Sequence, residues 1–195
     1  MKKGEITRQS IIEKSAPIFN TKGIAATAMS DIMEATKLSK GSLYVHFDNK
    51  DDLAAVVVDY TLEQLRLKLI ASINKHIGAK EQLFAYFDQY VDSMHPPMVG
   101  GCPMMNFGTE ADDLNQVIRK RVNKSIDSAQ ALLEDIIKKG IAAGVFKPEW
   151  DYKEFAALAF AMIEGGILIN RVSGSNSKMK IINRNLKQMV EANLL

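Results

Sequence analysis

Several side chains that can contact nucleic acid follow one another near the N-terminus of the 195-residue chain. Over residues 40 to 47 the spacing of apolar residues predicts a short helix. Its outward positions would be Lys40, Ser42, Tyr44, Val45 and His46. An ammonium, a hydroxyl, a phenol and an imidazole on one exposed helix face can meet the phosphates and base edges of a DNA duplex. The plain alternative is a helical hairpin with a polar surface.

Neighbouring elements must hold this helix at a fixed angle. Residues 28 to 36 predict a second short helix, joined to the first by residues 36 to 39, in which Ser39 would cap the helix that follows. A third helix over residues 5 to 22 would back both. The apolar residues expected to pack the three together are Ile12, Phe19, Ile32, Leu38, Leu43 and Phe47. This pattern predicts a helix-turn-helix module whose second helix can enter the major groove.

A specific family resemblance covers residues 5 to 55. The matching residues are Ile11, Ile12, Phe19, Gly23, Thr27, Asp31, Ile32, Ser39, Lys40, Gly41, Ser42, Leu43, Tyr44, His46, Phe47 and Lys50. At this spacing they resemble the DNA-binding domain of the TetR family of bacterial transcriptional regulators. The resemblance implies a ligand-responsive repressor that binds a palindromic operator in double-stranded DNA as a homodimer. It implies release by a small effector, and the methionine and aromatic residues of the irregular segment described below predict that this effector is lipophilic.

The resemblance also implies roles for the matching residues. Those expected to hold the DNA backbone are Tyr44, His46 and Lys50, and those expected to read bases are Lys40, Ser42 and Val45. Thr27 would cap the helix before the recognition helix and touch a phosphate, and residues 27 to 29 would reach the groove edge. The full predicted set of DNA-contacting residues is Thr27, Ala28, Met29, Lys37, Ser39, Lys40, Gly41, Ser42, Tyr44, Val45, His46 and Lys50.

One turn residue departs from the family pattern. Lys37 occupies a position that is usually glycine. A lysine held at positive φ costs roughly 1 kcal/mol or more. We therefore expect either a relaxed turn or a compensating contact between Lys37 and a phosphate.

The rest of the chain has apolar residues at helical spacing nearly everywhere. Helices are predicted over residues 50 to 76, 79 to 95, 113 to 143, 151 to 172 and 177 to 194. Residues 94 to 107 hold three prolines and cannot form one regular helix. The prediction is an all-α protein of about nine helices, with a DNA-binding domain over residues 1 to 48. Residues 49 to 195 would bind the effector and a second subunit.

The irregular segment is the predicted effector site. Residues 100 to 113 are similar to a sequence that lies near the inducer pocket in a subset of such regulators. Methionine and aromatic side chains adapt to varied apolar ligands, although they pack protein cores equally well, so pocket and core both stay open. The predicted pocket residues are Phe87, Met94, Met98, Cys102, Met104, Met105 and Phe107.

Cys102 is the only cysteine. A thiol beside a glycine-rich turn suggests a regulator that senses oxidants or electrophiles, while a small buried apolar residue is the plainer interpretation. A second alternative is a helical protein-interaction module without specific DNA binding, which the small net charge of +2 favours.

The last two helices are the predicted dimer interface. They would form a four-helix bundle with a second copy, and the pair Gly165-Gly166 would permit close approach. The predicted interface residues are Phe155, Leu158, Met162, Gly165, Gly166, Ile169, Met179, Ile182, Leu186 and Met189.

Composition and charge exclude other classes of protein. The chain is 47% hydrophobic and 25% charged, as expected for a globular protein. Residues 1 to 50 carry 8 basic and 5 acidic residues, a net charge of +3. The remaining residues carry 17 basic and 18 acidic residues, a net charge of −1, so the N-terminal quarter is mildly basic. A lone cysteine and the lack of an uncharged apolar window of about 18 residues predict a cytoplasmic protein that neither is exported nor spans a membrane.

No residues have the spacing of a catalytic or metal site. The three histidines, His46, His76 and His95, lack metal-ligand spacing, and no serine lies in a nucleophile elbow. We therefore expect no enzyme activity, no cofactor and no metal.

Overall fold

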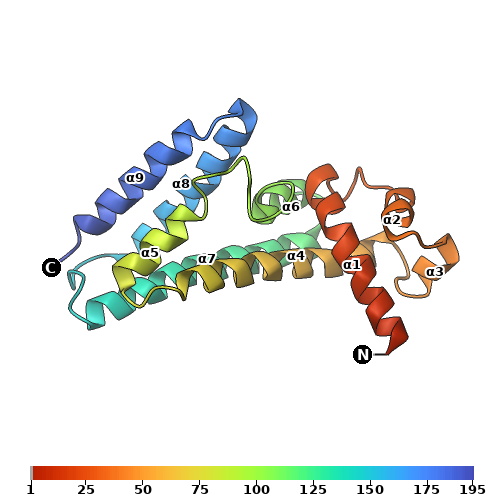
Figure 1. The fold of residues 1–195 in the computed structure, drawn as a ribbon, viewed down its shortest axis with the longest axis horizontal. Coiled ribbons are helices and arrows are strands. Elements are labelled where there is room, and N and C mark those ends of the chain that lie inside the picture. The colour runs from red at the N-terminus through yellow and green to blue at the C-terminus, as the bar shows by residue number, and fades with distance from the viewer. Residues whose placement is uncertain (1) are drawn as a thin grey trace. The chain divides into compact units, whose positions relative to one another are not determined.

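The chain folds into helices throughout. The computed structural model describes residues 2–195, and within them it has nine helices and no strand, which confirms the predicted all-α class (Figure 1). The helices are α1 (Lys3–Lys22), α2 (Met29–Thr36), α3 (Lys40–Tyr44), α4 (Lys50–Ile73), α5 (Ala79–Asp88), α6 (Pro103–Ala111), α7 (Gln116–Ala142), α8 (Tyr152–Ser173) and α9 (Ser177–Glu191).

These helices group into two compact units. The first contains residues up to 65 and residues 98–125; the second contains residues 66–97 and 126–195. Helices α4 and α7 each contribute one part to each unit. The structure thus groups the start of α4, all of α6 and the start of α7 with the helix-turn-helix head. The functional boundary after residue 48 stays a prediction.

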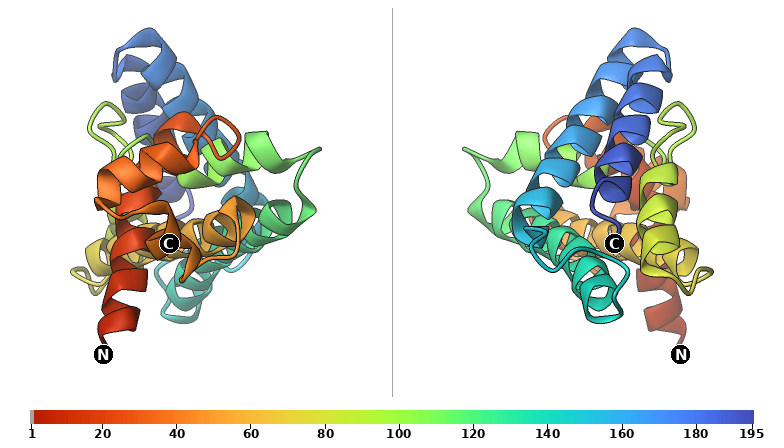
Figure 2. Two further views of the ribbon diagram at one scale, coloured as in Figure 1. Left: turned by 90° about the vertical axis from the view of Figure 1, so that its right-hand side faces the viewer. Right: turned by 90° about the vertical axis from the view of Figure 1, so that its left-hand side faces the viewer.

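The first unit contains the three-helix head. Helix α1 packs on α2 and on α6 (Figures 1 and 2). The residues that the sequence analysis assigned to its core are buried, namely Ile12, Phe19, Ile32, Leu43 and Phe47, with Leu38 partly buried. Arg8 of α1 covers the ring of Phe47, its guanidinium carbon lying 4.7 Å from the ring centroid. The apolar pattern therefore predicted correctly which side of α3 faces the head.

The turn between α2 and α3 holds Lys37 in the left-handed conformation, with φ 60° and ψ 27°. Its backbone N–H donates to the carbonyl oxygen of Met33 at 2.9 Å and so ends α2. The turn is therefore not relaxed, and the expected contact between Lys37 and a phosphate stays a prediction. Among the non-glycine residues that the structure describes, Lys37 is the one with positive φ.

Lys37→Gly is expected to stabilise the protein by about 0.5–1 kcal/mol, because glycine adopts this conformation without the Cβ clash that an L-residue meets. Urea unfolding followed by circular dichroism measures the change. Lys14→Gly, in the exposed middle of α1, is the matched control and should destabilise by about 1 kcal/mol. A Lys37→Gly variant that is less stable than the parent would contradict this account of the turn.

Helix α6 lies where the sequence predicted irregular structure. Residues 89–102 do form turns and bends, but a regular helix begins at Pro103. Proline is tolerated at the first helical position, where its missing N–H would have no helical partner. Cys102 is the N-cap residue, and its carbonyl accepts from the N–H of Asn106 at 3.0 Å.

The second unit is built on α8 and α9, an antiparallel pair on which α5 packs (Figure 2). Its core contains an aromatic chain in which Trp150 stacks edge-to-face on Phe146 and Phe155, with ring centroids 5.0 and 4.9 Å apart. Gly166 of α8 allows α9 to approach closely, because a Cβ there would lie 2.6 Å from the Met179 sulfur. This glycine is therefore needed for packing within one chain.

Helix α5 ends at Asp88, seven residues before the predicted end at residue 95. The chain beyond it is tied to the turn between α8 and α9. Asp92 accepts from the Asn176 amide at 2.7 Å and contacts Nδ1 of His95 at 2.9 Å, and Asn176 in turn accepts from the N–H and hydroxyl of Ser93. The hydrogen bond with His95, then that from Asn176, lowers the pKa of Asp92 to about 2.

Helix α8 is unusually apolar for a helix at a protein surface. By length and composition alone it could cross a membrane, a test that core helices of soluble proteins also pass. Only 39% of its apolar window is buried within the chain. Much of the apolar surface of α8 is therefore left uncovered by this single copy.

Candidate DNA-binding interface

The recognition helix α3 is fixed at its start by a serine cap. The Ser39 hydroxyl accepts from the N–H of Ser42 at 3.2 Å and lies 3.0 Å from the Ser42 hydroxyl. This confirms the predicted cap. Because Leu43 is buried two residues before the exposed Val45, the helix presents one defined face outward.

The outward face of α3 carries most of the predicted DNA-contacting residues. Tyr44 is 40% exposed and Val45 is 80% exposed. The Lys40 ammonium lies 5.9 Å from the centroid of the Tyr44 ring, so both side chains occupy one patch. The other predicted contact residues that are exposed are Ala28, Lys37, Ser39 and Gly41, and those partly buried are Met29, Ser42, His46 and Lys50.

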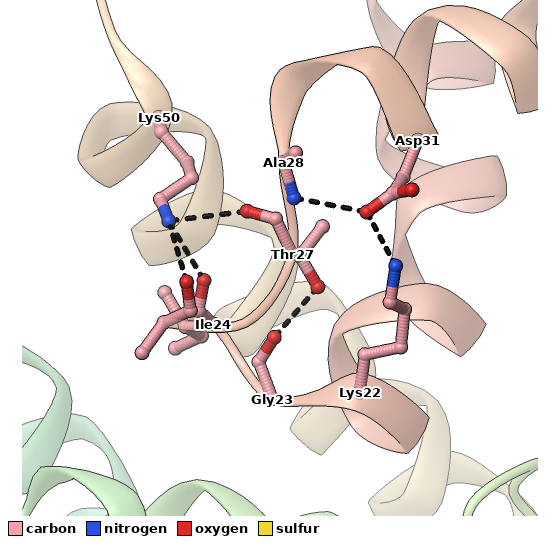
Figure 3. A network of polar contacts seen from close by, with 8 residues as sticks. Lys22, Gly23, Ile24, Thr27, Ala28, Asp31 and Lys50 are labelled. Carbon is pink, nitrogen blue, oxygen red and sulfur yellow. Dashed lines mark hydrogen bonds and ion pairs between the residues drawn. The ribbon is translucent and has the colours of Figure 1, made fainter.

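Lys50 binds the protein's own backbone. Its ammonium donates to the carbonyl oxygens of Ile24, Ala25 and Thr27 at 3.0, 3.2 and 3.1 Å (Figure 3). Three carbonyl acceptors use the three N–H donors of an ammonium group. In this structure Lys50 therefore fastens the start of α4 to the turn between α1 and α2, whereas the resemblance implied a contact with the DNA backbone.

Thr27 differs from its predicted role. It is 1% exposed, and its hydroxyl donates to the carbonyl oxygen of Gly23 at 2.6 Å (Figure 3). The start of α2 is capped by Asp31, whose carboxylate accepts from the N–H of Ala28 at 2.9 Å. The Thr27 hydroxyl is buried and bound to Gly23, so in this structure it neither caps α2 nor reaches a phosphate. The assignment of Thr27 to both roles is therefore corrected.

Asp31 also pairs with the end of α1. Lys22 donates to its carboxylate at 2.6 Å, and this hydrogen bond, followed by that from Ala28, lowers the pKa of Asp31 below its usual 3.8 (Figure 3). The ionised carboxylate therefore serves α1 and α2 together. Sequence spacing gave a capping signal here, because Asp31 lies three residues after the N-cap residue.

Helix α6 holds the same turn through Glu110. The two carboxylate oxygens accept from the backbone N–H groups of Ile24 and Ala25 at 2.7 and 2.5 Å. Gly23 makes room for this carboxylate, because a Cβ there would lie 3.1 Å from it and φ is 85°. Sequence reasoning missed Glu110 as a functional residue, since its partners lie 85 and 86 positions away.

An amide network joins the end of α1 to the loop before α6. Asn20, 3% exposed, donates to the carbonyl oxygens of Val99 and Gly101 at 2.6 and 3.2 Å. Asn106 donates to the backbone and side-chain oxygens of Asn20 at 2.9 and 3.1 Å, and to Gly100 at 3.0 Å. We call Glu110, Asn20 and Asn106 the α6 latch.

The predicted effector residues are divided between the two units. Phe87 and Met94 belong to the second, whereas Met98, Cys102, Met104, Met105 and Phe107 belong to the first. Those buried are Phe87, Cys102, Met104 and Phe107; Met98 and Met105 are partly buried and Met94 is exposed. Cys102 is 6% exposed, which leaves an oxidant or electrophile little access to its thiol and favours the plainer interpretation.

A short helix with an exposed cationic and aromatic face, held on a buried three-helix head, defines a helix-turn-helix DNA-binding protein. Residues 11–57 match the family described as bacterial regulatory proteins, tetR family, and residues 79–186 match the tetracyclin repressor-like C-terminal domain. The chain belongs to the TetR family of bacterial transcriptional regulators.

Relatives support this membership over the whole chain. A TetR-family regulator from Cytophaga hutchinsonii has the same fold with a TM-score of 0.94 and 37% identity, covering 100% of this chain and 98% of that one. A helix-turn-helix transcriptional regulator of Mycobacterium tuberculosis is 28% identical over 96% of this chain and 95% of its own. The transcriptional repressor DhaR of Mycobacterium sp. strain GP1 is 24% identical over 83% of this chain and 80% of its own.

The protein is thus a DNA-binding transcriptional regulator, and regulators of this family dimerise and are not enzymes. Family membership favours DNA binding over the alternative of an interaction module without specific DNA binding.

Proposed function

We propose that this protein is a cytoplasmic repressor that binds a palindromic operator as a homodimer and dissociates when a small lipophilic effector binds. The observation that carries the DNA-binding part is the outward face of α3, where Lys40, Tyr44 and Val45 stand exposed on a helix fixed from behind. The similarity to DhaR, a repressor, supports the direction of control.

A single recognition helix reads too few base pairs for specific binding. Two heads related by a two-fold axis place their recognition helices about 34 to 36 Å apart, one turn of the duplex, and so read a palindrome. The proposed operator therefore has two inverted half-sites whose spacing is set by the dimer.

The proposed dimer interface is the outward face of α8 with the adjacent part of α9. Its large apolar residues are between 44% and 80% exposed; they are Leu158, Leu168, Ile169, Val172 and Ile181. Gly165 lies at the centre of this face, and beyond its chain neighbours and the backbone of its own helix no atom lies within 4 Å of a Cβ built there. Leu158 and Val172 lie seven residues before and after it. In an antiparallel α8 pair centred on Gly165, Leu158 of one subunit would therefore lie against Val172 of the second copy.

Four residues of the predicted interface lie in the protomer's own core instead. These are Phe155, Gly166, Met179 and Leu186, all buried. Helical periodicity cannot distinguish burial against α9 of the same chain from burial against a partner. Leu158 and Ile169 are exposed and stay in the proposed interface. The partly exposed residues of the predicted set also stay in it, namely Met162, Gly165, Ile182 and Met189. Three exposed residues are added to it, namely Leu168, Val172 and Ile181.

Charge supports the antiparallel orientation. Leu158 and Met189 line a groove of about 380 Å³ that Glu149, Asp151 and Glu154 also line, and the exposed Lys153 is the one basic residue among these three carboxylates. The other end of the helix pair exposes basic residues, namely Arg171, Lys178 and Lys180. An antiparallel pairing brings the acidic end of one copy to the basic end of the other, and complementary charges fix register in this way.

The α6 latch provides a route for the effector to act on DNA binding. Glu110 and Lys50 hold the turn between α1 and α2 from α6 and from α4. An effector bound among the methionine and aromatic residues near α6 would shift this helix. The turn leads directly into α2, so the head would change position and operator affinity would fall, to the extent that the effector prefers the shifted state.

The test is a fluorescence-anisotropy titration against duplex from upstream of the protein's own gene and against a scrambled duplex, over a salt series. We expect tight binding of the first alone. Lys40→Ala should weaken it and reduce the preference for this duplex over the scrambled one, because the Lys40 ammonium is assigned to base edges. Lys75→Ala, an exposed lysine of the second unit, is the matched control and should leave the affinity and the preference unchanged.

Equal, weak binding to both duplexes, repeated with sequences selected from a random library, would overturn the proposal. A Lys40→Ala protein with the affinity and the sequence preference of the parent would remove Lys40 from the proposed interface.

A further inference from the structure

Val45 is an aliphatic side chain that the head does not use. It is 80% exposed, whereas Leu43 and Phe47 on either side are buried. Its backbone N–H already donates to the carbonyl oxygen of Gly41 at 3.2 Å, so the side chain is what it offers to a ligand. An isopropyl group this exposed contributes little to the stability of the monomer, so it is free to bury apolar surface against a ligand.

Gly41 is a second feature that the fold does not require. It lies one helical turn before Val45, so the two share a face. Beyond its chain neighbours and the backbone of its own helix, no atom lies within 4 Å of a Cβ built at Gly41, and it is not among the positive-φ glycines. An alanine would therefore fit. The pair presents a backbone position without a side chain beside an isopropyl group, on the exposed face that also carries Lys40 and Tyr44.

Base edges in the major groove offer one apolar group. Apart from C–H groups such as the C5–H of cytosine, the other groups there are hydrogen-bond donors or acceptors, whereas thymine presents its C5-methyl group. An isopropyl group placed on a donor or acceptor would strip it of water without replacing the hydrogen bond, which is unfavourable. Contact with a methyl group buries apolar surface on both sides and is favourable.

We propose that Val45 recognises the C5-methyl group of a thymine in each operator half-site and that Gly41 permits the close approach that this contact needs. The inference rests on the proposed function, since it assigns a base to a residue of the same interface. It predicts a sequence preference at one position of each half-site, set by an apolar contact.

The experiment begins with duplexes selected from a random library by the intact protein. In the best duplex each thymine is replaced in turn by deoxyuridine, which removes only the methyl group. We expect one symmetric pair of positions at which the replacement weakens binding about fourfold in one half-site and about fifteenfold in both. In Val45→Ala the same replacement should have no effect, while replacements elsewhere act as in the parent.

Two further variants separate the contact from general damage. Val117→Ala, at an exposed valine on α7, is the matched control and should keep the full response to deoxyuridine. Gly41→Ala should weaken binding of the thymine duplex while leaving the melting temperature equal or higher, because alanine favours helix.

The outcomes distinguish the two claims. If no duplex is enriched, the proposed function fails and this inference with it. If a duplex is enriched but no thymine methyl couples to Val45, the inference alone is overturned, and Val45 then contacts only sugar or phosphate.

Discussion

Gly165→Arg is expected to convert the dimer into monomers and to weaken operator binding at least about 100-fold. Arginine has open space at this position in the single chain and favours helix over glycine, so the monomer should fold as before. At the centre of an antiparallel α8 pair, however, two arginines would meet across the two-fold axis. Like charges and added volume would then separate the copies. Loss of bivalent binding accounts for the size of the effect.

Sedimentation equilibrium measures the change in assembly, and anisotropy against the operator duplex measures the change in affinity. Asn74→Arg places the same side chain on an exposed site of the second unit outside α8 and α9 and is the matched control. It should leave the dimer and the affinity unchanged. A Gly165→Arg protein that sediments as a dimer would show that this face of α8 is not the interface.

Glu110→Ala is expected to lower the free energy of unfolding by about 3 kcal/mol. Each carboxylate oxygen accepts one backbone N–H, from Ile24 and from Ala25. A hydrogen bond to a charged group contributes roughly 1.5–3 kcal/mol, and Ile24 is buried, so its N–H is poorly placed to find water. Glu110→Gln keeps one acceptor but turns an amide donor toward the second N–H. Glu110→Gln should therefore lower the free energy of unfolding by at least about half as much as Glu110→Ala does.

Urea unfolding measures the stability, and amide hydrogen exchange at Ile24 and Ala25 should quicken in both Glu110 variants. Asp113→Asn is the charge-matched control, because this neighbouring carboxylate is exposed. We expect both Glu110 variants to weaken operator binding as well, since the turn they loosen carries α2. Unchanged exchange at the two amides would show that the latch does not hold the turn.

Local interactions made the head predictable. The Ser39 cap, the left-handed Lys37 and the division of α3 into a buried side with Leu43 and an exposed side with Val45 each depend on residues within a few positions. Helical periodicity and capping chemistry operate over that range, so the sequence carries these signals directly. Pro103 shows the limit of this local reading. It was counted with the other prolines as a sign of irregular structure, whereas it is the first residue of α6.

The sequence by itself determined the all-α class, the helix-turn-helix motif and the outward residues of the recognition helix. Only the tertiary structure decided that Thr27 is buried, that Lys50 binds backbone carbonyls, and that Glu110 holds a turn 85 positions away. It also placed Met179 and Gly166 inside the protomer and left Leu168 and Val172 outside. The type of an apolar or charged residue indicates that it must be buried or paired. Which residue it contacts depends on how segments distant in the sequence pack, and local spacing does not encode that packing.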